Sequence, residues 1–257
     1  MSDDLVRSVR SQDGVWRMTL DAPRANALTP ELLDAIRQAL DAVETADPDT
    51  LIIAGGKNFC SGGDVARFLE AAEDGKALSY AQTVVPALQD IVLRLVSLPG
   101  TVAVAARGAI TGGGAGFLFA SDCAVVAPNT FLQPYYGRVG FAPDGGWIAL
   151  LPGRIGAARA NAWIATDARY RAGRLEEIGL CNAVASDPEY TVDRLYENIC
   201  TGTRRAAKAL FWTAEKRAAL ERSLAAETSA FLDRIDTPMV RARMKAFVTR
   251  NVALTDV

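Results

Sequence analysis

The chain has 257 residues, of which 50% are hydrophobic and 23% are charged, and its formal net charge is −2. This length suffices for a sizeable core in one large domain, or in one domain with a helical appendage. The near-neutral charge lacks the basic bias of proteins that bind nucleic acids. We therefore expect an ordinary globular protein without a nucleic-acid partner.

The N-terminal segment carries no targeting pattern. Its first ten residues are polar and acidic, whereas a signal peptide begins with basic residues and continues into an apolar stretch. No window reaches the roughly 18 uninterrupted apolar residues that predict a transmembrane helix. We expect a cytoplasmic protein that makes no use of a membrane.

The sequence contains no histidine, which removes Ser-His and Cys-His nucleophile pairs and histidine metal sites. Its four cysteines lack metal-ligand spacing, so we expect them to be reduced and mostly buried: Cys60, Cys123, Cys181 and Cys200. No Cys, Asp or Glu cluster has convincing ligand spacing, and no metal is expected. Acid–base chemistry is left to Asp, Glu, Tyr, Lys, Cys or a bound water.

Strands and helices alternate in the first half of the chain. Residues 15–20 have the pattern of a strand, and Thr29-Pro30 starts a helix with Thr as N-cap and Pro at the first position. A short buried strand at 51–54 is followed by the glycine-rich loop 55–64 and a helix at 65–72. Such alternation favours parallel pairing through right-handed crossovers.

A long helix is expected at 78–98, where Pro86 is a candidate for a kink or a division and Pro99-Gly100 ends the pattern. The apolar strand 102–106 follows.

Three consecutive glycines, Gly112 to Gly114, lead into the apolar run 115–120, which has the pattern of a helix N-terminus. Glycines allow a ligand close to the backbone, and the first N–H groups of a helix favour negative charge. An oxyanion or a phosphate fits equally well, and so does a turn that only packs a helix against a sheet.

Helical patterns dominate the rest of the chain, with no strong strand after Val184. Helices are expected at 147–151, 157–165, 174–178, 208–232 and 239–248. The last two are amphipathic, which suggests that they lie against the main domain or a neighbouring subunit. Their aromatic residues are expected to form helix-packing core: Phe211, Trp212, Phe231 and Phe247.

Several segments, in this order, resemble motifs of the crotonase superfamily, also called the enoyl-CoA hydratase/isomerase family. They are PRANAL at 23–28, FCSGGDV at 59–65, GGG at 112–114, FLQP at 131–134, GFAPDGG at 140–146 and MKAFV at 244–248. The resemblance implies an α/β fold, a spiral of ββα repeats with a helical C-terminal region. It divides the chain into a core at 1–190 and a trimerisation region at 191–257.

The same resemblance implies an acyl-CoA thioester as the small-molecule substrate, no separate cofactor, and a homotrimer or hexamer. It places the N–H groups of Gly63 and Gly113 on the thioester carbonyl, where two fixed donors stabilise an enolate. Residues at the family's nucleotide and pantetheine contacts are Arg24, Ala25, Ser61, Asp64 and Val65, together with the two glycines. For Arg24, a solvated surface charge is the alternative.

Hydratases of the family use two glutamates, and the resemblance puts those positions at Gly116 and Tyr135. Neither residue is acidic. Tyrosine, with an unperturbed pKa of about 10, donates a hydrogen bond or holds a water but is a poor base near neutral pH. We expect Tyr135 to contribute in that weaker way, and Tyr135 or Tyr136 to shape the acyl pocket.

Asp144 is the remaining acid in the matched loops. The resemblance gives an aspartate here the role of base in one group of enoyl-CoA isomerases and of nucleophile in 4-chlorobenzoyl-CoA dehalogenase, and the PDGGW form is closer to the isomerases. A helix cap near Gly145 is the alternative. The sequence favours an enoyl-CoA isomerase over atypical hydration or thioester hydrolysis with Asp144 and water, and over an inert acyl-CoA-binding homologue.

The acyl pocket wall is expected to include residues from several loops: Arg67, Phe68, Tyr80, Val84 and Phe141.

Overall fold

The structure, a computed structural model, describes residues 5–11 and 14–255. Its main sheet has six strands in the order β1-β2-β3-β4-β6-β9. Their bounds are Val6–Arg10, Val15–Leu20, Thr50–Gly55, Thr101–Ala106, Cys123–Val126 and Ala183–Val184. Only β1 and β2 pair antiparallel, and the other described neighbours pair parallel.

The central strands β3 and β4 are buried along their whole length. Their Val, Ile, Leu and Ala side chains suit a parallel strand that is covered on both faces. Thr50 pairs with Thr101 at the start of the two strands, so the strands also end at the same edge of the sheet. The loops that follow them are therefore brought together.

A second sheet has three strands, and two of them follow directly after main-sheet strands: β5 follows β4, and β7 follows β6. It has the order β5-β7-β8, with bounds Ala109–Thr111, Phe131–Gln133 and Tyr170–Arg171. Strand β5 leads through the short 3₁₀ helix Gly112–Ala115 into α5, Gly116–Ala120. A strand in each sheet followed by a helix is the ββα repeat, and the expected α/β spiral is confirmed.

The long helices of the first half form as expected. Helix α2, Pro30–Ala46, begins where Thr29 Oγ1 accepts from the Leu32 amide at 3.3 Å. Helices α3, Val65–Glu73, and α4, Ala77–Ser97, follow. Helix α4 is one helix across Pro86, whose ring faces solvent, so the chain is not divided there.

Short helices connect the repeats. They are α1 Pro23–Asn26, α6 Tyr136–Val139, α7 Leu151–Ile155, α8 Ala157–Thr166, α9 Ala172–Glu177 and α10 Pro188–Leu195.

The helix expected at 147–151 is wrong. The chain forms a turn there, and α7 begins only at Leu151. The physical reason is local: Gly145 and Gly146 have φ of 65° and 96°, outside the helical region, and the amides of the turn bond to a side chain instead of to helix carbonyls.

The helix expected at 208–232 is two helices, α11 Thr201–Phe211 and α12 Ala214–Ile235. Thr213 breaks the pattern because its hydroxyl accepts from the Lys216 amide at 3.3 Å and caps α12. The break leaves Phe211 62% exposed, so its assignment to the core is wrong for this chain, whereas Phe231 is buried as expected.

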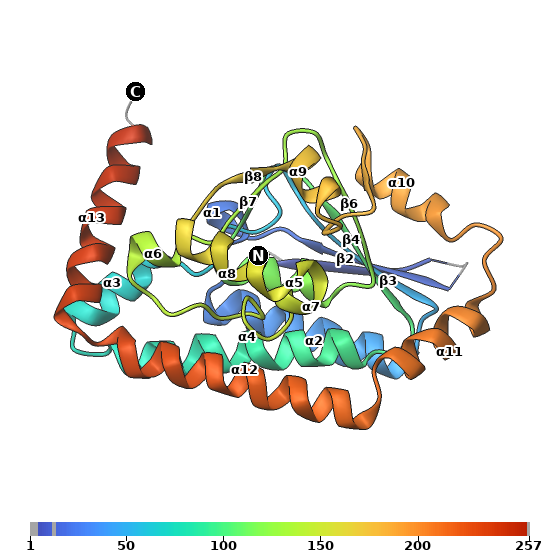
Figure 1. Ribbon diagram of the computed structural model, residues 1–257, viewed down its shortest axis with the longest axis horizontal. Helices are drawn as coiled ribbons and strands as arrows, with labels where there is room; N and C mark the ends of the chain where they lie inside the picture. Colours follow the sequence, from blue (N-terminus) through green and yellow to red (C-terminus); the bar gives the residue numbers. More distant parts are fainter. Residues whose placement is uncertain (1–4, 12–13, 256–257) are drawn as a thin grey trace.

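Helix α12 runs along α4 under the sheet, and α13, Pro238–Thr255, turns back to pack against α3 and α6 (Figure 1). The C-terminal helices thus return to the edge at which β3 and β4 end. No helix within residues 5–11 and 14–255 combines the length and the apolar character that crossing a membrane requires.

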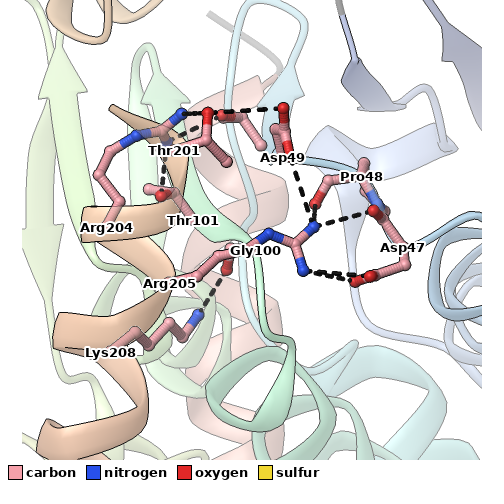
Figure 2. A network of polar contacts seen from close by, with 10 residues as sticks. Asp47, Pro48, Asp49, Gly100, Thr101, Thr201, Arg204, Arg205 and Lys208 are labelled. Atoms are coloured by element: carbon pink, nitrogen blue, oxygen red, sulfur yellow. Dashed lines mark hydrogen bonds and ion pairs between the residues drawn. The ribbon is translucent and has the colours of Figure 1, made fainter. Parts of the chain in front are cut away.

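Helix α11 docks at the opposite edge, where β3 and β4 begin, through three cationic side chains (Figure 2). Arg204 donates to Thr101 Oγ1 at 2.6 Å, and Arg205 donates to both carboxylate oxygens of Asp47 at 3.0 and 3.1 Å. Lys208 donates to the Gly100 carbonyl at 3.0 Å.

Candidate active site

A cavity of ≈ 470 Å³ lies where β3, β4 and β5 end. Most of the site residues expected from the sequence line it: Arg24, Ser61, Gly63, Asp64, Val65, Gly113, Tyr135 and Asp144. Ala25 does not line it, because its backbone carbonyl accepts from the Ser61 amide at 2.9 Å and faces the loop. The structure therefore brings together side chains from segments far apart in the sequence.

The two glycine-rich loops are joined by hydrogen bonds. The Cys60 amide donates to the Ala109 carbonyl, and the Thr111 amide donates to the Cys60 carbonyl, each at 3.0 Å. The Thr111 hydroxyl also donates to the Ser61 carbonyl at 2.7 Å. These bonds hold the backbones of Gly63 and Gly113 in one rigid frame.

Both predicted oxyanion donors are available. Among the described residues, the Gly63 N–H has no hydrogen-bond acceptor, and Gly113 is the second residue of a 3₁₀ helix, where N–H groups have no partner inside the helix. A Cβ at Gly113 would lie 2.7 Å from Leu88 Cδ2 and 3.1 Å from Asp144 Oδ1, so a side chain there would displace Leu88 and press on the Asp144 carboxylate. The Asp144 carboxylate thus lies directly beside one donor.

The mouth of the cavity begins with an unusual turn. Arg24, Ala25 and Asn26 all have φ between 56° and 59°, a left-handed conformation held by the buried Asn26 side chain, whose Nδ2 donates to the Phe59 carbonyl at 3.0 Å. The Arg24 guanidinium forms an ion pair with the buried Asp64 carboxylate at 3.0 Å. Arg24 thus has an ion-pair partner in the cavity lining, while its side chain stays 58% exposed, so both the ligand contact and the alternative of a solvated surface charge remain predictions.

Asp64 also caps α3, because its Oδ1 accepts from the amides of Ala66 and Arg67 at 3.2 and 3.3 Å. Its contribution to the cavity is the placement of the loop and of Arg24.

Asp144 is 7% exposed, and burial raises the pKa of its carboxyl to about 6. The Tyr136 hydroxyl donates to Oδ1 at 2.6 Å and partly opposes that rise, while burial and the negative charge of Asp144 raise the pKa of Tyr136 well above its usual value. The helix-cap alternative is wrong, because the next helix begins only at Leu151, seven residues after Asp144. A carboxylate with this pKa titrates close to neutral pH.

The positions of the two hydratase glutamates hold no acid. A Cβ at Gly116 would lie 2.5 Å from the Gly145 carbonyl oxygen and 3.0 Å from Val92, so the backbone of the Asp144 loop fills the space. Tyr135 has φ of 63°, donates its amide to Asp167 Oδ1 at 2.5 Å, and accepts at its hydroxyl from Arg169 at 2.9 Å.

The far wall of the cavity is apolar. Phe68, Phe141 and Phe231 pack with ring centroids 4.9 to 5.8 Å apart, and all three line the cavity. Val84 lines it as expected, but Arg67 and Tyr80 do not: Arg67 pairs with Glu31, and the Tyr80 ring packs behind Phe68. This wall suits the hydrocarbon part of a ligand.

Two residues of the site were missed by the sequence reasoning. Glu227, on α12 and 4% exposed, accepts from the amides of Gly146, Ile148 and Ala149 at 2.8, 2.6 and 2.7 Å. Burial raises the pKa of Glu227 to about 7. The available signal was an acid at a buried helical position, in step with Leu220, Leu224 and Phe231.

The second is Trp147, whose fully buried indole donates from Nε1 to the Gly112 carbonyl at 2.8 Å. Within the described residues, no group of three or more Cys, Asp or Glu side chains is arranged to hold a metal ion.

Known proteins with similar sequences and structures indicate the family of this chain. The family model described as enoyl-CoA hydratase/isomerase matches residues 10–253. The trans-2-decenoyl-acyl-carrier-protein isomerase of Streptococcus mutans is 27% identical over 198 residues, which are 76% of this chain and 74% of that protein. The 1,2-epoxyphenylacetyl-CoA isomerase of Escherichia coli is 28% identical over 179 residues, 68% of each chain.

Among solved structures, an enoyl-CoA hydratase from Bacillus halodurans superposes with a TM-score of 0.85 at 20% identity, covering 94% of this chain and 99% of that one. This likeness concerns the fold. Together with the family match over nearly the whole chain, it shows that the protein belongs to the enoyl-CoA hydratase/isomerase family, the crotonase superfamily.

Proposed function

We propose that the protein is an enoyl-CoA isomerase that moves a double bond of an acyl-CoA thioester by a 1,3-proton transfer. One observation carries this proposal: the buried Asp144 carboxylate lies in the cavity beside Gly113, while both glutamate positions of the hydratases lack an acid. The other buried carboxylate that lines the cavity, Asp64, is engaged by the Arg24 guanidinium and by the first amides of α3. The two-glutamate addition of water therefore has no residues to run on, whereas one carboxylate suffices to move a proton.

The thioester carbonyl would accept from the N–H groups of Gly63 and Gly113. These donors are fixed before the reaction, in a cavity with an apolar wall, so they stabilise the oxygen as it gains negative charge. Arg24, Ser61, Asp64 and Val65 line the entrance and would contact the pantetheine and nucleotide arm. The phenylalanine wall would receive the acyl chain.

The proton transfer can be written for a 3-enoyl thioester. The Asp144 carboxylate takes one proton from C2, and the electron pair of the broken C–H bond is delocalised over the carbonyl oxygen and C4. The protonated Asp144 then returns the proton to C4, which gives the conjugated 2-enoyl thioester. No atom is gained or lost, and no oxidant or reductant is required.

The pKa of Asp144 supports this role, since a base is most effective when its pKa lies near the working pH. Tyr136 holds the carboxylate by one oxygen and leaves the other for the substrate. The Streptococcus mutans relative is named as an isomerase of a decenoyl group, which agrees with a double-bond shift.

A panel of cis-3-, trans-3- and trans-2-enoyl-CoA thioesters tests the proposal, with products identified by retention time and mass. We expect 3-enoyl substrates to give 2-enoyl products of unchanged mass. A product heavier by one water would favour hydration with Asp144 and water, and release of free CoA would favour hydrolysis. No turnover despite binding of acetoacetyl-CoA in calorimetry would favour the inert acyl-CoA-binding homologue.

We also propose a homotrimer or a hexamer. The support is the exposed apolar surface on the C-terminal helices and the Asp144 loop, where Leu210, Phe211, Met239 and Ile148 are each more than 40% exposed. Light scattering at micromolar concentration tests this, and a monomer mass would contradict it.

A further inference from the structure

The indole N–H of Trp147 donates to the carbonyl of Gly112 at 2.8 Å. That carbonyl and the N–H of Gly113 belong to one peptide unit. A trans peptide is planar, and its C=O and N–H point in opposite directions. A hydrogen bond that fixes the Gly112 carbonyl therefore also fixes the direction of the Gly113 N–H.

This peptide needs such an anchor more than most. It joins two glycines, so no side chain of either residue restrains its rotation. Gly112 has φ of 50°, a conformation that glycine adopts readily. A glycine–glycine peptide that turned away from the cavity would take the Gly113 N–H with it.

Trp147 is itself firmly held. Its ring packs edge-on against Phe119, Tyr136 and Trp163, with centroids 5.1, 6.0 and 5.4 Å apart. On either side of it in the chain, the amides of Gly146 and Ile148 bond to the buried Glu227 carboxylate. The aromatic core thus holds the indole ring, and Glu227 of α12 holds the backbone on both sides of Trp147.

We infer that Trp147 is a positioning residue that aims the Gly113 N–H at the thioester carbonyl. The inference rests on the proposed function only in requiring that a thioester binds at Gly63 and Gly113. It links Asp144 and the oxyanion donor, since Trp147 follows Asp144 in the same loop.

Trp147→Phe keeps an aromatic ring and removes the N–H. The matched control is Trp163→Phe, because Trp163 is also fully buried and packs against Trp147. Its indole N–H donates to the Ala168 carbonyl at 2.7 Å, and this carbonyl is not part of the glycine turn. The readout is the infrared carbonyl band of a bound, isotopically labelled acyl-CoA, together with kcat and the dissociation constant. A carbonyl band reports polarisation by the donors and does not require turnover.

We expect the wild type and Trp163→Phe to shift the bound carbonyl band to lower frequency, and Trp147→Phe to lose much of that shift. We expect kcat to fall by about 10- to 100-fold in Trp147→Phe, less than the roughly 10²–10³-fold measured for outright loss of a donor, with little change in acyl-CoA affinity. Equal shifts and equal kcat in Trp147→Phe and the wild type would overturn the inference while leaving the proposed function intact. No shift in the wild type would overturn the thioester site itself, and the inference with it.

Should Trp147→Phe not fold, 3-benzothienylalanine at position 147 keeps the shape of the indole and replaces only the N–H. The same loss of the carbonyl shift is expected, and an unchanged shift contradicts the inference.

Discussion

Strands β3 and β4 hold two very different sites at their two ends. Where they begin, α11 is attached by the cationic side chains of Arg204, Arg205 and Lys208 (Figure 2). The Lys208 ammonium also lies 2.7 Å from the Asp122 carboxylate. Where they end, the cavity is built from backbone N–H groups, glycines and one aspartate. At the first end the polar groups form hydrogen bonds that attach α11 to the sheet. At the second end the Gly63 N–H has no acceptor among the described residues.

The difference indicates where substitutions should affect stability and where they should affect chemistry. A charge pair that holds α11 contributes to folding and nothing to a reaction at the far edge. The burial of a carboxylate such as Asp144, whose partner is the neutral Tyr136 hydroxyl, costs folding free energy, and perturbed groups of this kind gather at functional sites.

The largest effect is expected for Asp144→Asn, which keeps the shape and the Tyr136 contact but cannot take a proton near neutral pH. Isomerisation should fall by about 10²–10⁴-fold, while acyl-CoA affinity changes little because the proposed oxyanion donors are backbone groups. Steady-state kinetics and calorimetry on the purified variant measure both quantities. Turnover near that of the wild type would remove Asp144 from the mechanism.

The same carboxylate gives a pH dependence of defined sign. Its pKa is raised from 3.8 to about 6, so kcat should fall as the pH drops through about 6. The pKa of Glu227 is raised from 4.5 to about 7. For both groups the folded state binds protons more tightly than the unfolded state, so their joint contribution makes stability decrease as the pH rises from about 4 to 7.

Thermal unfolding across this range tests the sign. Asp144→Asn should show a shallower loss of stability between about pH 4 and pH 6 than the wild type. An equal slope in both proteins would mean that Asp144 is not buried as the structure has it.

At the other end of the strands, Asp122→Asn should destabilise the fold by about 3 kcal/mol, because it leaves the buried Lys208 ammonium without its carboxylate. Asp90→Asn is the matched control, since it breaks an exposed pair with Arg37 and should cost less than about 1 kcal/mol. Chemical denaturation measures both values. A drop in kcat of the folded Asp122→Asn protein would contradict the separation of the two ends.

Both carboxylate oxygens of Glu227 accept hydrogen bonds from loop amides, whereas the NH₂ group of a glutamine would meet one of these N–H donors. The Asp144 loop would then be displaced, and Glu227→Gln should lower kcat by about 10-fold or more. Glu221→Gln removes a charge from an exposed position of the same helix and serves as the control. Unchanged kinetics in Glu227→Gln, at an unchanged unfolding midpoint, would show that the hydrogen bonds of Glu227 to the loop do not position Asp144.

The smallest effect is expected for Tyr135→Phe. Its ring is held by Phe247 and its amide by Asp167, and only the hydroxyl contact with Arg169 is lost. The rate should fall by less than about 10-fold, an effect smaller than that of the carboxylate. A loss as large as that of Asp144→Asn would move the acid–base role to Tyr135.

Much of this architecture could be predicted from the sequence because its signals are local. The Thr29 cap, the apolar strand at 102–106 and the glycine turn each lie within a few residues, and the order of the motifs identified the superfamily. Strands of two or three residues such as β8 and β9 could not be predicted, since they are too short to show a period.

The contacts that complete the candidate site are of a different kind. Glu227 reaches a loop about eighty residues earlier in the chain, and Trp147 reaches back to Gly112. No sequence pattern states such a pairing, so these roles emerge only when the fold is known. The division of the chain at residue 190 stays a prediction, although α12 and α13 contribute Phe231, Phe247 and Val248 to the cavity.

The central claim is that one carboxylate moves a proton between two carbons of a thioester. It is tested most directly by incubating a 3-enoyl-CoA with the wild type and with Asp144→Asn in deuterium oxide, and following C2 and C4 by NMR and mass. The account predicts that the wild type forms the 2-enoyl thioester with C2 and C4 as the sites of proton exchange, and that the variant exchanges neither at a comparable rate. A 3-hydroxyacyl product, or equal exchange at C2 in both proteins, would contradict it.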